Sequence, residues 1–214
     1  MIPRALVLAT VAVVTAAALT GCGRLSAGPE TSETREISGV TAVVLDTDGD
    51  VEITEGEPSL TIHAPENVID RLTSEVSDGV LELGRSGGPM PFAGEIRYEL
   101  TVPSLDAIEI NGSGDVSSTV VGDALTITIS GSGDVSVSGT ADSLDIEIDG
   151  SGEVDADDLE VTDATVEISG SGDAELHVTG TLRVDISGSG SVSHRGGAEV
   201  DADISGSGDV DADD

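Results

Sequence analysis

The chain has 214 residues, with 42 acidic and eight basic side chains, and its formal net charge at pH 7 is −34. So acidic a surface repels nucleic acid and anionic lipid headgroups, whereas cations, basic proteins and neutral glycans stay possible partners. Aromatic residues make up 1% of the chain and tryptophan is absent. This composition argues against a thick globular core and favours a thin fold filled by Val, Ile, Leu and Ala.

Residues 1–21 are typical of an export signal. Arg4 precedes an apolar run from Ala5 to Ala18 that is too short for a comfortable transmembrane helix. Leu19-Thr20-Gly21-Cys22 then resembles the bacterial lipobox, whose cysteine is lipidated and becomes the new N-terminus. Cys22 is the only cysteine, so no intrachain disulfide can form. We expect a lipoprotein held in the cell membrane, on its extracytoplasmic face, through lipid on Cys22.

Residues 22–35 are mostly small and polar, which predicts a lipidated tether. Residues 36–104 alternate between apolar and polar side chains in several places, which predicts an N-terminal β region. Its strand candidates are Val40–Leu45, Val51–Ile53, Leu60–Ile62, Val80–Leu83 and Ile96–Val102. Asn67–Val76 fits a helical turn or two as well as a strand, and Gly84–Gly94 is expected to be a loop.

A short Gly-Ser-Gly turn recurs through residues 105–214. Its first glycines are Gly112, Gly131, Gly150, Gly170, Gly188 and Gly206. The intervals of 18–20 residues indicate a solenoid, in which each coil buries its apolar side against its neighbours. We therefore predict an all-β fold: a β-solenoid, similar to a parallel β-helix, with an N-terminal β-rich capping region. Asp48-Gly49-Asp50-Val51 looks like a degenerate first copy of the turn.

Stacked coils place equivalent residues in columns. The column two residues before the first glycine comprises Ile110, Ile129, Ile148, Ile168, Ile186 and Ile204. Period-2 alternation predicts that Ile129 is buried and that its neighbour Thr128 is exposed. A further inward column contains His194, for which a tolerated edge residue is preferred over a functional histidine.

Several stretches carry a family resemblance. They are Val51–Gly56, Ala64–Asn67, Val76–Leu81, Leu100–Leu105 and, most specifically, Ile108–Val116 together with His194–Ala198. Together they are similar to the GIN-domain family of auto-transporter adhesin heads. The resemblance covers about residues 36–212 as one domain. It implies an all-β repeat fold on a bacterial envelope protein, often a lipoprotein, and it brings no catalytic residues.

The turn carboxylates are the candidate metal ligands, and stacking would place them in a row about 4.8 Å apart. They are Asp115, Asp134, Glu153 and Asp173. One interpretation is that each accepts hydrogen bonds from backbone N–H groups of its own turn. The other is that the row, with the nearby Asp155, Asp157 and Asp158, binds calcium weakly. The first is preferred because Ser191 breaks the row and no known calcium-loop spacing is present.

No catalytic residues and no cofactor are assigned. A serine nucleophile needs a neighbouring base, and none of the three histidines, His63, His177 and His194, lies in a triad context. Paired carboxylates leave glycoside chemistry open, although sugar-stacking aromatic residues are missing from the repeat. We therefore expect a non-enzymatic adhesion or binding module with a protein or glycan ligand. A structural or regulatory lipoprotein that binds another protein is the alternative, and a β-helix enzyme acting on polysaccharide is the third hypothesis.

Overall fold

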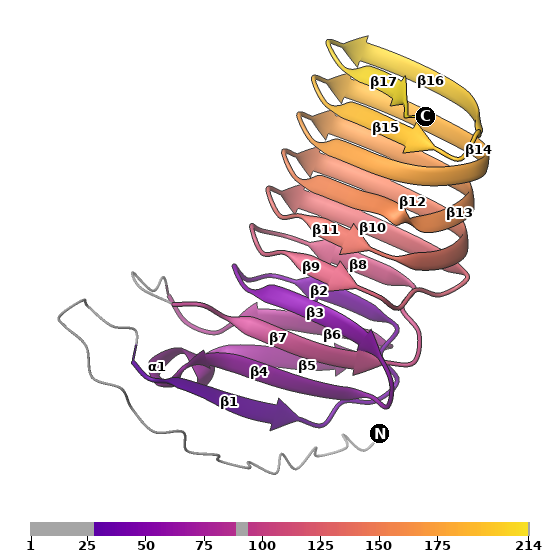
Figure 1. Cartoon of the computed structure of the whole chain (residues 1–214). Coiled ribbons are helices and arrows are strands. Elements are labelled where there is room, and N and C mark those ends of the chain that lie inside the picture. Colours follow the sequence, from indigo (N-terminus) through magenta and orange to yellow (C-terminus); the bar gives the residue numbers. More distant parts are fainter. Residues whose placement is uncertain (1–27, 89–93, 214) are drawn as a thin grey trace, which may run out of the picture.

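The computed structural model describes residues 28–88 and 94–213, which form a tall stack of β-coils closed at one end by antiparallel strands (Figure 1). The expected signal peptide and the first six residues of the expected tether, which include Cys22, lie outside the described residues. Within the described ranges, no helix is both long and apolar enough to cross a membrane.

Six coils carry the Gly-Ser-Gly turn, and their strands pair in parallel and in register. The strands that lead into the turns are β8 (Ala107–Ile110), β10 (Ala124–Gly131), β12 (Gly139–Gly150), the ends of β13 (Glu153–Gly170) and β14 (Asp173–Gly188), and β16 (Glu199–Gly206). The strands that follow are β9 (Val116–Ser118), β11 (Val135–Val137), the starts of β13 and β14, β15 (Ser191–Arg195) and β17 (Asp209–Ala212). Ile129 thus lies between Ile110 and Ile148 in neighbouring coils. The predicted β-solenoid is confirmed.

The N-terminal region supplies two further coils, which the sequence did not reveal as repeats. β2 (Ala42–Leu45) and β3 (Asp50–Glu55) pair in parallel with β8 and β9. On their other edges they pair with β6 (Val80–Arg85) and β7 (Arg97–Val102). The β2–β3 coil therefore sits between elements that come later in the chain, and residues 46–49 form its turn. The proposed degenerate copy of the turn is a real turn of the stack.

Antiparallel strands and one short helix cap the lower end of the stack. β4 (Ser59–Pro65) runs antiparallel between β1 (Glu30–Arg35) and β7, and β5 (Leu72–Ser77) runs antiparallel to β6. Helix α1 (Glu66–Ile69) precedes β5. The segment Asn67–Val76, for which the sequence allowed either a helix or a strand, therefore contains parts of both. The predicted N-terminal cap is confirmed.

The expected tether was too long, because residues 30–35 form strand β1 rather than linker. Every residue of β1 has a register partner on β4, and several of its side chains are half-buried. Ser and Thr are common in linkers, but Thr also suits an edge strand, where one face stays in water. Composition alone therefore could not separate the two states.

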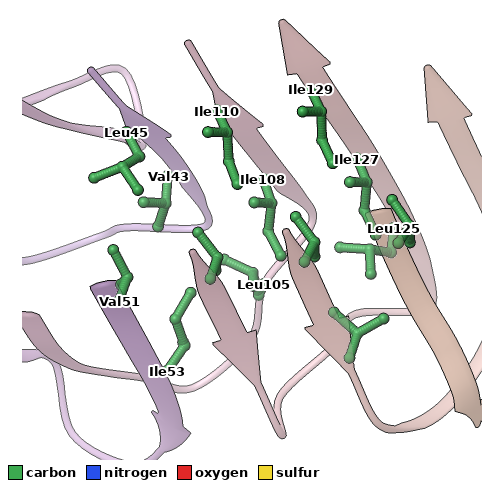
Figure 2. Close-up of a cluster of buried hydrophobic side chains, with 14 of the residues drawn as sticks. Val43, Leu45, Val51, Ile53, Leu105, Ile108, Ile110, Leu125, Ile127 and Ile129 are labelled. Atoms are coloured by element: carbon green, nitrogen blue, oxygen red, sulfur yellow. The ribbon is translucent and has the colours of Figure 1, made fainter. Parts of the chain in front are cut away.

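One continuous hydrophobic core fills the inside of the stack. Figure 2 shows Ile108, Ile110, Ile127 and Ile129 pointing inward from successive coils toward residues such as Leu105. Ile129 is fully buried, as predicted. Thr128 is half-buried rather than exposed, because its register partners are the longer side chains of Glu109 and Glu147.

The turn glycines are required for two different reasons. Gly131 has φ +148°, a conformation that side chains disfavour, and a Cβ there would lie 2.2 Å from the carbonyl oxygen of Gly112. At Gly133 the φ angle is unexceptional, but a Cβ would lie 2.2 Å from the carbonyl oxygen of Gly114. The close approach of stacked turns is the second reason.

Candidate binding face along the acidic turns

The structure brings the four candidate carboxylates side by side. Each of them directly precedes the first inward residue of the strand after its turn, and those inward residues are register partners in successive coils. Asp50 occupies the same position in the β2–β3 coil and extends the row downward, because Val51 is the register partner of Val116. We call these five residues the acidic row: Asp50, Asp115, Asp134, Glu153 and Asp173.

Hydrogen bonds tie the acidic row to the backbone of the next coil. The carboxylate of Asp115 accepts the backbone N–H of Asp134 at 3.1 Å, and that of Asp134 accepts the N–H of Glu153 at 3.0 Å. Asp173 likewise accepts the N–H of Ser191 at 2.8 Å. The prediction that each aspartate bonds within its own turn is therefore wrong. A stacked turn presents its free N–H directly above the carboxylate, which makes it the nearer donor.

The bonding pattern changes where glutamate replaces aspartate. The N–H of Asp173 donates to the carbonyl oxygen of Gly152 at 3.2 Å instead of to the Glu153 side chain. Because glutamate is one methylene longer, its carboxylate lies farther from the backbone of the coil above. The substitution thus keeps the charge of the row, and the bond between these two coils passes from a side-chain acceptor to a backbone carbonyl.

A groove of about 400 Å³ runs beside the acidic row, over the short strands β3, β9, β11 and the start of β13. Burial, followed by repulsion from Asp134 and other carboxylates, raises the pKa of Glu153 above its ordinary value. Burial and then the charge of Asp115 raise the pKa of Asp50, against the opposing effect of Arg97. The groove therefore concentrates negative charge that a cationic group would relieve.

Asp50 and Arg97, two charged residues of this groove, were not identified as site residues from the sequence. Asp50 precedes Val51 as Asp115 precedes Val116, so aligning the degenerate turn with the repeat would have found it. Arg97 lies opposite Asp50 in the register of β7 and β3. Its position could not be predicted, because it depends on the insertion of the β2–β3 coil above β6 and β7.

The carboxylates of the row do not form a metal centre in the described part of the chain. No group of three or more His, Cys, Asp or Glu side chains there is arranged to hold a metal ion. Asp115, Asp134 and Asp173 each direct an oxygen at the backbone of the next coil. Weak calcium binding stays a prediction.

The three histidines lie in separate surroundings. His63 faces Glu99, with Nε2 and Oε1 3.4 Å apart, and His177 faces Glu160 at 3.9 Å. His194 is buried on the inward register predicted for it, where its register partners are Leu176 and Ala212. Across residues 28–88 and 94–213, no hydrogen bond joins a serine hydroxyl to a histidine ring.

Comparison with known proteins identifies the fold and the family. The chain is similar to the solved structure of a "putative adhesin" from Bacteroides fragilis, with a TM-score of 0.71, 21% identity, and 86% of this chain and 97% of that chain covered. It is also similar to a "Putative lipid binding protein" from Parabacteroides distasonis, with a TM-score of 0.59, 22% identity, and 87% and 98% of the two chains covered. No curated protein matches the chain.

Identities this low support the shared fold alone. The family evidence is separate and comes from the family model described as "Putative auto-transporter adhesin, head GIN domain", which matches residues 40–198. That range begins just before β2 and ends after β15, so it takes in the acidic row and most of the solenoid. The chain therefore belongs to the GIN-domain family.

Proposed function

We propose that this protein is a lipid-anchored, non-catalytic binding module of the cell envelope, of the adhesin type. The observation that carries the proposal is the family match over residues 40–198, on a solenoid that displays repeated rows of side chains. The export signal and the lipobox cysteine Cys22 support its place on the extracytoplasmic face of the membrane.

The position of the anchor relative to the fold suits a display role. β1 begins at Glu30, so residues 23–29 separate Cys22 from the capped end of the stack. A fully extended chain of seven residues spans at most about 25 Å. A lipid on Cys22 would therefore keep the cap near the membrane, while the C-terminal coils lie at the opposite end of the stack (Figure 1).

The acidic row and its groove are the surface that we propose for the ligand. Stacked carboxylates give a periodic negative surface, which favours a ligand that carries cationic groups or donates several hydrogen bonds. The hydrogen bonds between coils hold Asp115, Asp134 and Asp173 in place before binding, which lowers the entropy lost on association.

Binding to purified bacterial cell walls tests this function. The chain from Gly23 onward contains every described element and lacks the lipid, so its sedimentation with cell walls reports direct binding. We expect saturable binding with no release of soluble sugar. Release of fragments would instead indicate an enzyme, and absence of binding would favour the alternative in which the ligand is another envelope protein.

A matched pair of variants locates the ligand. Asp115→Asn, Asp134→Asn and Asp173→Asn together remove three charges from the row, while the amide oxygens can still accept the backbone N–H groups. Glu147→Gln, Glu167→Gln and Asp185→Asn remove three charges from a different face of the solenoid, on the strands β12, β13 and β14 that lead into the turns. We expect the first set to weaken cell-wall binding at least fivefold and the second to leave it within twofold. The reverse result would move the site off the acidic row.

The anchor is tested separately with Cys22→Ala. Because Cys22 supplies the only thiol, we expect the variant to stay as an uncleaved precursor without acyl label. A variant of mature size that still carries acyl label would contradict the lipobox assignment.

A further inference from the structure

The last coil presents an open sheet edge at the C-terminal end of the described stack. β16 pairs with β14 on one side, and β17 pairs with β15 on one side. Within residues 28–88 and 94–213, no strand pairs with the other edge of either strand. A free edge exposes unpaired N–H and C=O groups, which can accept another strand.

The same coil also exposes two aliphatic side chains whose register partners in the coil below are buried. Val200 and Ile204 are 38% and 39% exposed, whereas their register partners Leu182 and Ile186 are 1% and 0% exposed. The open edge is thus the same surface on which each earlier coil receives the next one. A strand placed there would continue the existing packing.

Acidic side chains flank this apolar edge. Six residues from 199 to 213 are acidic and none is basic: Glu199, Asp201, Asp203, Asp209, Asp211 and Asp213. In β16 the outward Glu199, Asp201 and Asp203 alternate with the inward Val200, Ala202 and Ile204. A strand that matched this edge would therefore alternate aliphatic with basic residues.

The chain contains its own example of such a basic pairing. Arg183 of β14 is the register partner of Asp201, and its Nη1 lies 3.2 Å from Oδ2 of that aspartate. Beside this pair, Asp203 has only Asp185 as its register partner in the coil below. A basic side chain on the free side of β16 would supply Asp203 with the cation that Arg183 supplies to Asp201.

We propose that the free edge of β16 is a docking site for an extended segment of a partner protein, in which aliphatic residues alternate with Lys or Arg. The segment adds as one more strand, through backbone hydrogen bonds to β16 and aliphatic contacts with Val200 and Ile204. This site is separate from the acidic row and independent of cell-wall binding. The two proposals can therefore fail separately.

A second copy of the chain fits this edge less well. Antiparallel pairing of two β16 strands about Ala202 would match their inward faces but set Asp201 opposite Asp203 of the other copy. Like charges directly opposite each other on neighbouring strands are destabilising. Charge complementarity therefore selects a basic partner over self-association.

Two peptides of matched length test the proposal on the chain from Gly23 onward. The probe is Arg-Val-Arg-Ala-Arg-Ile-Ser-Gly, which is the β16 sequence with its three acids replaced by arginine, and the control is the β16 sequence itself. We expect the arginine peptide to bind saturably and to slow hydrogen exchange in β16, and the control peptide not to bind. No binding of the arginine peptide, or equal binding of both peptides, would overturn the proposal.

Variants separate a built site from general attraction between charges. Ile204→Lys, at an already exposed position, should reduce arginine-peptide binding at least tenfold. Asp201→Asn with Asp203→Asn should do the same, while Glu147→Gln with Glu167→Gln should change it less than twofold. An equal loss in both pairs would reduce the effect to overall charge and contradict the site. A dimer of the unmodified chain that Ile204→Lys makes monomeric would show that a second copy is the occupant instead.

Discussion

The two ends of the solenoid differ in how well the inward side chains of the terminal strands are buried. At the lower end, β4 lies antiparallel between β1 and β7, and its inward Leu60, Ile62 and Ala64 are fully buried. At the upper end, β16 and β17 repeat the coil pattern, and Val200 and Ile204 stay partly in water. Nearly identical coils therefore have different stability according to their neighbours, because each coil buries its apolar side only against the next.

The two ends therefore suit different roles. The capped end buries its inward aliphatic side chains and lies closest in the chain to the proposed anchor Cys22. The upper end keeps the pairing surface of the repeat, but acidic residues flank it. Charged residues on an edge strand oppose indiscriminate aggregation, so the same residues both protect the edge and select its proposed partner.

The largest expected difference between the ends comes from one substitution in two coils. Ile129→Asp buries an unpaired carboxylate in the middle of the stack, which costs several kcal/mol, on the order of the whole stability of a domain. Ile204→Asp places the same group at the open end, where water reaches it, and should cost less than about 1 kcal/mol. Thermal melts of the two variants measure the difference. Equal losses of Tm would contradict the open end.

A smaller difference is expected at the turn glycines. A Cβ at Gly150 would lie 2.1 Å from the carbonyl oxygen of Gly131, and one at Gly206 would lie 2.0 Å from that of Gly188. Gly150→Ala should cost about 1–3 kcal/mol, because coils on both sides hold the clash in place. Gly206→Ala should cost less, because the last coil can shift outward. Gly112→Ala is the control in urea titrations, since its nearest contact would be 3.5 Å away.

A still smaller effect is expected from Glu153→Gln, midway between the two ends. Burial and neighbouring carboxylates raise the pKa of Glu153 from its ordinary value of 4.5, so the folded state binds the proton more tightly than the unfolded state does. Ionisation of Glu153 therefore lowers stability at neutral pH, and this loss disappears as the pH falls below about 4.5.

Glu153→Gln should accordingly raise Tm at pH 7, by an amount worth less than about 1 kcal/mol because the side chain is largely exposed. The gain should vanish near pH 3. Glu57→Gln, an exposed position outside the acidic row, is the matched control. A gain that persists unchanged at pH 3 would contradict the charge explanation.

The smallest expected difference separates calcium from simple screening of charge. Millimolar calcium chloride and sodium chloride of equal ionic strength should raise Tm by the same amount relative to EDTA, because both screen the stacked carboxylates. A larger shift in calcium, abolished by Asp134→Asn with Asp173→Asn, would instead establish a calcium site on the row.

The repeat made much of the fold predictable. The spacing of the Gly-Ser-Gly turns and the period-2 alternation fixed the coil length, the isoleucine column and the inward position of His194. These features are local, since each coil repeats its neighbour about 19 residues away. The acidic row followed from the same register, so its four candidate residues were found from the sequence.

The remaining features depend on contacts that no local pattern encodes. The β2–β3 coil lies between the β6–β7 coil and the β8–β9 coil, although β7 and β8 follow each other in the chain. Neither Arg97 nor the lower end of the groove could therefore be placed from the sequence. The half-burial of Thr128 depends on the neighbours Glu109 and Glu147. The hydrogen bond that the N–H of Glu153 donates to the carboxylate of Asp134 depends on the distance between stacked turns.

Native-state hydrogen exchange along the chain tests the difference between the two ends most directly. If the lower end is closed and the upper end open, backbone amides in β4, β7 and β10 should exchange slowly, and those of β16 and β17 should exchange first. Protection should rise again from β14 downward, because β14 is paired on both edges. Protection in β16 equal to that in β10, or earlier exchange of β4 than of β16, would contradict the account.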